Sequence, residues 1–170
     1  SNNGLSQADL LRRLIDLDRL TVPPTDDEQS GIFSSSKCGS KDKDGWENWA
    51  TVQGPGVITR FWCERLAGEL RIILDDQPVV RGKVADFFRG AIEPFGEPLT
   101  YAISADAGGT SYYPIGFSKS CKIEVRGCEG RYQIDYAALP QGTQVEPLAG
   151  KMSEATEKTL AMVASTLKNG

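Results

Sequence analysis

The stretch from Trp46 to Glu64 constrains the fold most strongly, because it contains two runs in which side chains alternate along a strand. Gly54-Pro55-Gly56 separates the runs and predicts a bend between two strands. Successive side chains of a strand point to opposite faces. One face of the second run is therefore expected to form core, through Val57, Thr59, Phe61 and Cys63. The other face is expected to be exposed, and it carries Ile58, Arg60, Trp62 and Glu64.

Short segments with the same period follow at close intervals and are separated by Gly, Pro and Asp turns, one of them at Asp75-Asp76-Gln77-Pro78. Half-exposed strands of this kind favour an antiparallel sheet over a parallel one. We therefore predict a mainly β chain that forms an antiparallel jelly roll or β-sandwich. The expected strands are Trp46–Gln53, Val57–Glu64, Glu69–Leu74, Leu99–Ser104, Tyr112–Phe117, Cys121–Arg126 and Arg131–Tyr136.

Helices are expected at both ends of the chain. Residues 1–24 are predicted to form an N-terminal helical extension, residues 25–150 the jelly-roll domain, and residues 151–170 a C-terminal helix capped by Ser153. A long polar loop is expected from Thr25 to Gly45, and such loops are usually functional or disordered. The apolar stripe of the C-terminal helix has no evident partner, so we expect self-association through it. Gly82 to Pro98 reads as a longer excursion with a short turn at Val84–Phe88.

Composition excludes several classes of function. The net charge of −4 and the scattered basic residues argue against nucleic-acid and anionic-membrane partners. The absence of histidine excludes Ser-His-Asp and Cys-His nucleophile systems and His-ligated zinc. No cofactor and no metal site is predicted, and localisation is left open. The cysteines lack C-x-x-C spacing; Cys63 and Cys121 are expected to be buried thiols, whereas Cys38 and Cys128 are free to pair in an oxidising compartment.

A candidate sugar site follows from the exposed face of the second run. Arg60 and Glu64 flank Trp62, and an aromatic ring beside hydrogen-bonding charges suits a sugar, whose C–H face stacks on the ring. Asp42 and Asp44 of the preceding loop are expected to border this substrate-binding site. Glu64 and Asp44 are the best local candidates for catalytic carboxylates. The alternatives are a cross-strand salt bridge beside Trp62 and, for Asp42 and Asp44, a solvated turn or an adventitious calcium loop. Tyr112-Tyr113 is expected to supply one core ring and one surface ring.

The chain resembles the amino-terminal part of a bacterial family, glycoside hydrolase family 172, first catalogued as domain of unknown function 2961. The resemblance is carried, in this order, by GPGVITRFW, ILDDQP, Phe87-Phe88, YYPIGFSKSCKIEV and YQIDY, and it covers roughly residues 5–150. It implies a jelly roll from a two-roll protein that assembles into trimers or larger forms. It also implies a carbohydrate ligand, with fructofuranosyl or arabinofuranosyl residues cleaved or transferred with retention by paired carboxylates.

The sequence departs from the family pattern in the loop before the GPG strand. Lys37-Cys38 stand where the family has Asp-Arg, and only the serines and Asp44 persist. The family's catalytic glutamates lie in the second jelly roll, so we expect them outside this chain and expect the chain alone to be inactive. Three hypotheses remain: the substrate-facing part of a furanosidase, a non-catalytic carbohydrate-binding module, and a structural or assembly jelly roll.

Overall fold

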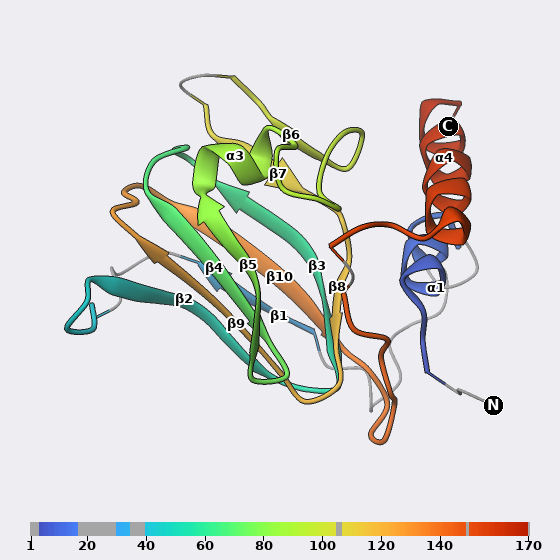
Figure 1. The fold of residues 1–170 in the computed structure, drawn as a ribbon, viewed down its shortest axis with the longest axis horizontal. Coiled ribbons are helices and arrows are strands. Elements are labelled where there is room, and N and C mark those ends of the chain that lie inside the picture. The colour runs from blue at the N-terminus through green and yellow to red at the C-terminus, as the bar shows by residue number, and fades with distance from the viewer. Residues whose placement is uncertain (1–3, 17–29, 35–39, 105–106, 149, 170) are drawn as a thin grey trace.

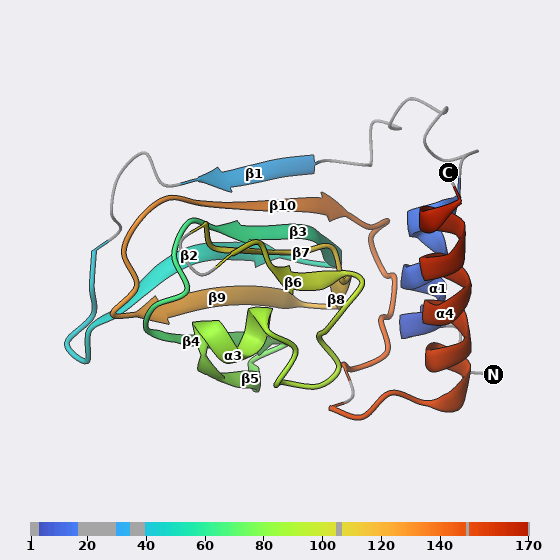
Figure 2. The same ribbon diagram turned by 90° about the horizontal axis from the view of Figure 1, so that it is seen from above.

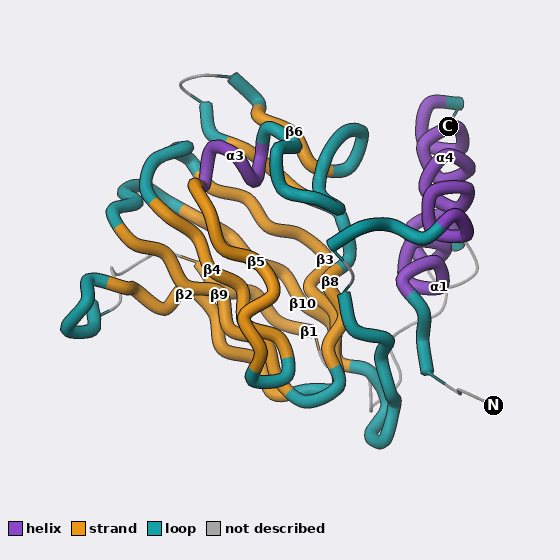
Figure 3. The backbone as a smooth tube through the Cα atoms, viewed as in Figure 1, coloured by secondary structure: helices purple, strands orange, loops and turns teal. Residues whose placement is uncertain are grey.

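The computed structural model describes residues 4–16, 30–34, 40–104, 107–148 and 150–169 (Figure 1). Two antiparallel sheets form a sandwich, and two helices stand side by side at one end of it, as the view from above also shows (Figure 2). Strands make up most of the body (Figure 3). The prediction of a mainly β, antiparallel sandwich with a helix near each end of the chain is therefore confirmed.

The first sheet has the strand order β1-β10-β3-β7-β6, and β8 also pairs with β3. Its strands are β1 (Ser30–Ser34), β10 (Tyr132–Ala138), β3 (Gly56–Cys63), β7 (Gly109–Ser111), β6 (Thr100–Ala102) and β8 (Ile115–Phe117). The second sheet has the order β2-β9-β4-β5. Its strands are β2 (Trp46–Gln53), β9 (Ser120–Arg126), β4 (Glu69–Leu74) and β5 (Gln77–Lys83), and a short helix, α3 (Val84–Phe88), follows.

Aromatic rings fill the space between the sheets. Phe61 is 1% exposed and lies 5.8 Å from the Phe87 ring and 5.2 Å from the Phe88 ring. Trp49 meets Phe61 edge-on at 6.2 Å and stacks on Tyr132 at 4.1 Å. Because the rings come from β2, β3, α3 and β10, they join both sheets into one core. The prediction that Phe61 and Cys63 point into the core is correct.

A bulge in β3 changes the expected alternation. Between Arg60 and Ile58, the register against β10 shifts at Asp135/Tyr136, which leaves Thr59 without an opposite residue. An extra residue reverses the faces on one side of it. Ile58 therefore belongs to the main core, and Val57 belongs to a second cluster under α1. The prediction that placed Ile58 on the exposed face is wrong for this reason, and Thr59, predicted as core, is only half-buried. Val57 is buried as expected, although in the second cluster.

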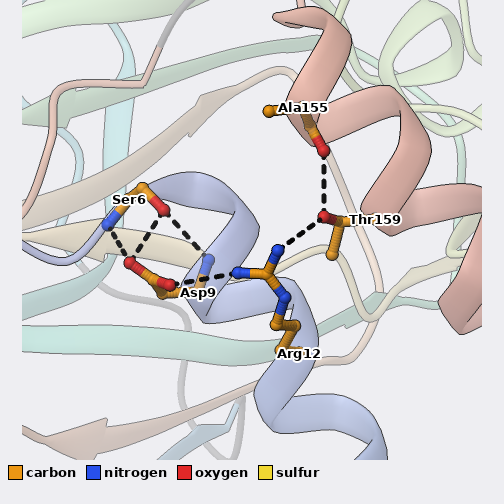
Figure 4. A network of polar contacts seen from close by, with 5 residues as sticks. All are labelled: Ser6, Asp9, Arg12, Ala155 and Thr159. Carbon is orange, nitrogen blue, oxygen red and sulfur yellow. Dashed lines mark hydrogen bonds and ion pairs between the residues drawn. The ribbon is translucent and has the colours of Figure 1, made fainter.

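The two terminal helices pack on each other. α1 (Gln7–Arg12), which continues as the 3-10 turn η1 (Arg13–Ile15), begins with a capping box between Ser6 and Asp9. Arg12 reaches from α1 to Thr159 of α4 (Glu154–Lys168), with 3.5 Å between Nη2 and Oγ1 (Figure 4). The inward side of α4, including Val163, is buried within the chain. The stripe therefore has a partner within the chain at Val163, whereas Leu167 is 53% exposed, and self-association remains a prediction.

Three segments differ from the strand predictions. β1 occupies part of the predicted Thr25–Gly45 loop, and β5 was not predicted as a strand, since it runs from the predicted turn at Asp75–Pro78 into the start of the predicted Gly82–Pro98 excursion. The predicted strand Tyr112–Phe117 begins after β7 has ended, and only its last residues form β8. The turn at Asp75 and Asp76 is confirmed, since both residues have positive φ and connect β4 to β5.

The described cysteines are free and buried. Cys63, Cys121 and Cys128 carry no disulfide, which agrees with the expectation for Cys63 and Cys121. Cys38, the proposed partner of Cys128, lies outside the described residues. Burial raises the pKa of Cys63 and Cys121 to about 12 and that of Cys128 to about 11. These thiols therefore stay protonated at neutral pH and are poor nucleophiles.

Candidate functional site

The outer face of the first sheet carries a group of polar and aromatic side chains around Trp62. In the strand register, Arg60 lies opposite Asp135, and Trp62 lies opposite Gln133 on one side and Thr110 on the other. Directly opposite residues of an antiparallel pair project to the same face. The Arg60 guanidinium also lies 5.9 Å from the centre of the Tyr112 ring. We call this surface the Trp62 face: Arg60, Trp62, Thr110, Tyr112, Gln133 and Asp135.

Two polar atoms of the Trp62 face are buried without a hydrogen-bond partner among the described residues. They are Arg60 Nε and the hydroxyl oxygen of Thr110, a residue that is only 4% exposed. Leaving a buried donor or acceptor unpaired costs about 1–3 kcal/mol, so such atoms are rare in folded proteins. They flank Trp62 on neighbouring positions of the sheet. A ligand that supplied hydrogen bonds here would remove this cost.

A hollow adjoins the Trp62 face over the β3–β10 bulge. It has a volume of about 500 Å³ and shares Asp135 with the face. Asp135 is held in place by the side-chain amide of Gln133, which donates to its Oδ1 at 3.0 Å. Thr59, the residue without an opposite partner, lines the hollow, and so does Ile32 of β1, which is 65% exposed. The bulge therefore creates a concave region beside the aromatic platform.

Glu64, predicted as a binding and candidate catalytic residue, lies just after β3 and holds a loop. Its carboxylate accepts from the backbone N–H of Arg131 at 2.8 Å and from the Arg131 guanidinium at 3.2 Å. The backbone hydrogen bond, followed by the side chain of Arg131, lowers the pKa of Glu64. An ionised carboxylate does not serve as a general acid at neutral pH. Glu64 therefore forms a salt bridge, as the alternative interpretation expected, but its partner is Arg131 rather than Arg60.

Asp42 and Asp44 lie in a turn next to the second sheet. Asp42 Oδ1 accepts from the backbone N–H of Asp44 at 2.8 Å and of Trp46 at 3.0 Å. The hydrogen bond from Trp46 is the main cause of the lowered pKa of Asp42. Asp42 Oδ2 also lies 3.9 Å from Arg71 of β4, and Asp44 is exposed. These contacts associate the turn with β2 and β4, whereas Arg60 and Trp62 belong to the first sheet.

The outer face of the second sheet is filled by an ordered charged layer. The guanidinium carbons of Arg71 and Arg126 lie 4.2 Å and 4.7 Å from the centre of the Trp46 ring. Arg71 Nε donates to Glu124 at 2.7 Å, and Arg126 Nε donates to Glu69 at 3.0 Å. Both arginines therefore have a carboxylate and an aromatic partner, and Trp46 is only 4% exposed beneath them. This face offers a ligand fewer unpaired groups than the Trp62 face.

Sequence reasoning missed Thr110, Gln133 and Asp135. Gln133 and Asp135 alternate with the buried Tyr132 and Ile134, which indicates that they lie on an exposed strand face. Nothing in the sequence places that face next to Trp62. The pairing of β10 with β3 makes that connection. Tyr112 and Tyr113 behave as expected, since Tyr112 is 38% exposed and Tyr113 is 2% exposed.

The described residues contain no group of three or more His, Cys, Asp or Glu side chains that could hold a metal ion. Among the helices described, none is long and apolar enough to cross a membrane.

Together, the sandwich, its aromatic and polar outer face and the adjoining hollow define a β-sandwich domain with a hollow beside one outer face. The family model described as the GH172 first β-sandwich domain matches residues 23–156, so the chain belongs to the GH172 family. The family makes it a domain of a carbohydrate-active protein. No curated protein matches the sequence.

Proposed function

We propose that the Trp62 face binds a furanoside sugar, of the fructofuranosyl or arabinofuranosyl type, within a furanoside-active protein. The observation that carries this proposal is the pair of buried, unpaired polar atoms, Arg60 Nε and Thr110 Oγ1, on either side of Trp62. A sugar stacked on the indole would bring hydroxyl groups that accept from Arg60 and pair with Thr110. Asp135, at the edge of the hollow, would accept from a further hydroxyl.

The proposal revises the predicted binding set. Arg60 and Trp62 stay in it, and Gln133 and Asp135 join them because they lie opposite on β10. Glu64 is engaged by Arg131, and the contacts of Asp42 are with the second sheet, so we assign neither to direct sugar contact. Asp44, an exposed residue of the same turn as Asp42, is not assigned either.

Replacing Trp62 by alanine is expected to weaken binding of a methyl furanoside by about tenfold or more, because the stacking platform is lost. Intrinsic tryptophan fluorescence and isothermal titration calorimetry would measure the dissociation constant. Trp46→Phe is the matched control, since Trp46 lies on the outer face of the other sheet and should leave binding unchanged. Equal weakening by both substitutions, or unchanged binding in Trp62→Ala, would refute the proposed site.

We further propose that the reaction's carboxylate pair is not on this chain. Retaining hydrolysis needs a general acid and a nucleophile about 5 Å apart. The described carboxyl groups with a shifted pKa, Asp9, Asp42, Glu64 and Asp76, are all shifted downward, which is opposite to the shift that favours a general acid.

The chain alone is accordingly expected to release no aryl alcohol from aryl α- or β-furanosides. The assay follows release spectrophotometrically, beside the full-length gene product. Turnover by this chain that is abolished by Glu64→Gln would move the reaction centre to Glu64 and overturn the assignment. The matched control is Glu69→Gln, which removes a carboxylate whose partner is Arg126 on the second sheet.

A further inference from the structure

A second, smaller pocket lies between the helical pair and the sandwich, away from the residues of the Trp62 face. Its volume is about 150 Å³, which accommodates a few non-hydrogen atoms but not a whole oligosaccharide. The residues that carry its chemistry come from α1, from the segment between β7 and β8, and from the start of α4. They are Gln7, Tyr113, Glu146, Lys151, Ser153 and Thr156.

Tyr113 gives this pocket an unused hydrogen-bonding group. The residue is 2% exposed; the Gln7 side chain is close enough to lower its pKa, but the hydroxyl proton has no acceptor among the described residues. Burial raises the pKa of Tyr113 to about 12, so the hydroxyl keeps its proton and can donate it at neutral pH. A buried tyrosine hydroxyl usually has a partner, because leaving it unpaired is costly. Its position in the lining therefore indicates a missing acceptor within the pocket.

The walls of the pocket are fixed by contacts that do not depend on a ligand. The Gln7 side-chain amide donates to the backbone carbonyl of Pro114 at 2.7 Å, which joins α1 to the segment before β8. Ser153 caps α4 by accepting from the backbone N–H of Thr156 at 3.2 Å. The Arg12–Thr159 contact then holds α1 against α4 (Figure 4). A ligand would thus enter a preformed space rather than build one.

Charge decides which class of ligand fits. Lys151 and Glu146 both line the pocket, so the lining contains one positive and one negative group. The first turn of α4 also carries Glu154 and Glu157, which would repel an anion approaching the helix N-terminus. A neutral group that both accepts and donates satisfies this lining best. Adjacent hydroxyl groups do so, since one oxygen can accept from Tyr113 or Lys151 while another hydroxyl donates to Glu146.

We propose that this pocket binds a vicinal diol, the neutral pair of adjacent hydroxyls found at the end of a sugar or a sugar alcohol. The site is separate from the Trp62 face and shares no residue with it, so it stands whether or not that face binds a furanoside. Tyr113 would donate to one ligand oxygen, and Glu146 would accept from the other hydroxyl.

The test is a titration of the ¹⁵N-labelled chain, followed by two-dimensional ¹H–¹⁵N spectra. Arabinitol and arabinose represent the two sources of the diol, and sodium acetate represents an anion. We expect saturable shifts at the amides of Gln7 and of residues 153–156 with at least one of the diols, and none with acetate. Tyr113→Phe should weaken this response by about tenfold or more, because one directional hydrogen bond is lost.

Two control variants make the result specific. Tyr136→Phe removes the same hydroxyl from a tyrosine of β10 and should leave the pocket response unchanged. Trp62→Ala should abolish binding at the Trp62 face and also leave the pocket response intact, so failure of one site is distinguishable from failure of the other. Tyr113→Phe should change Tm little, because the hydroxyl donates no hydrogen bond within the described structure. Shifts that do not saturate, stronger binding of acetate, or an unchanged response in Tyr113→Phe would each overturn the proposal.

Discussion

Replacing Phe61 by alanine is expected to lower the free energy of unfolding by about 3–5 kcal/mol, the usual range for truncating a buried phenylalanine. The ring is 1% exposed and meets the rings of Trp49, Phe87 and Phe88, which come from both sides of the sandwich. These neighbours are held by their own packing, so they cannot collapse fully into the space left by the ring. Urea denaturation followed by circular dichroism would measure the loss.

Trp62→Ala is the matched control for this experiment, since Trp62 follows Phe61 directly on β3 but points to the outer face. Its half-exposed ring buries less apolar surface, so we expect a loss of stability of about 1–2 kcal/mol and loss of sugar binding. Phe61→Ala should instead lower stability while leaving affinity unchanged in the fraction that is folded. Equal losses of stability in the two variants would contradict the assignment of the faces.

Replacing Gly108 by alanine is expected to lower the free energy of unfolding by about 3–5 kcal/mol, as for other severe steric changes. Gly108 has φ +74°, a conformation that side chains with Cβ rarely adopt, and its Cβ would overlap the carbonyl oxygen of Cys63. It would also lie 2.6 Å from the backbone carbon of Glu64. Because these atoms belong to backbone, β7 would have to move away from β3, the strand that carries Trp62.

Gly142→Ala separates the two causes of this loss. Gly142 has φ +82°, but its Cβ would meet no atom within 4 Å. The substitution therefore measures only the conformational strain, about 1–2 kcal/mol. Thermal and urea denaturation of both variants would give the difference, which we assign to displacement of β3 from β7. A Gly108 variant no less stable than the Gly142 variant would show that the close approach of the two strands is not required.

The sequence predicted best those strands that turn residues flank on both sides. β2 and β4 have the predicted bounds because turn residues flank each; the alternation of β4 is unbroken, whereas a register shift between Asn48 and Ala50 interrupts that of β2. β1 could not be predicted, since its five residues are an edge strand within a polar segment and its Ile32 is exposed. Gly31 of β1 is needed because the Tyr136 ring occupies the space of a side chain there, and this requirement is visible only in three dimensions.

The candidate site was predictable only in part, and the reason is the pairing of distant strands. Arg60 and Trp62 could be placed on an exposed face from the local period, because the bulge lies before them on β3. No local sequence pattern marks Thr59 as the extra residue of the bulge, so Ile58 was predicted on the exposed face although it lies in the core. Gln133 and Asp135 lie in the site because β10 pairs with β3, and sequence spacing does not reveal that pairing. It does not reveal the ion pair of Asp42 with Arg71 of β4 either.

The layer of Trp46, Arg71 and Arg126 gives the domain two unequal sides. On that side the guanidinium groups of Arg71 and Arg126 already pair with Glu124 and Glu69, so few free hydrogen-bonding groups are left for a ligand. On the opposite side Arg60 Nε and Thr110 Oγ1, beside Trp62, have no hydrogen-bond partner among the described residues. Under the proposed function, a bound sugar would therefore lie on the first sheet, and the second sheet would face away from the carbohydrate.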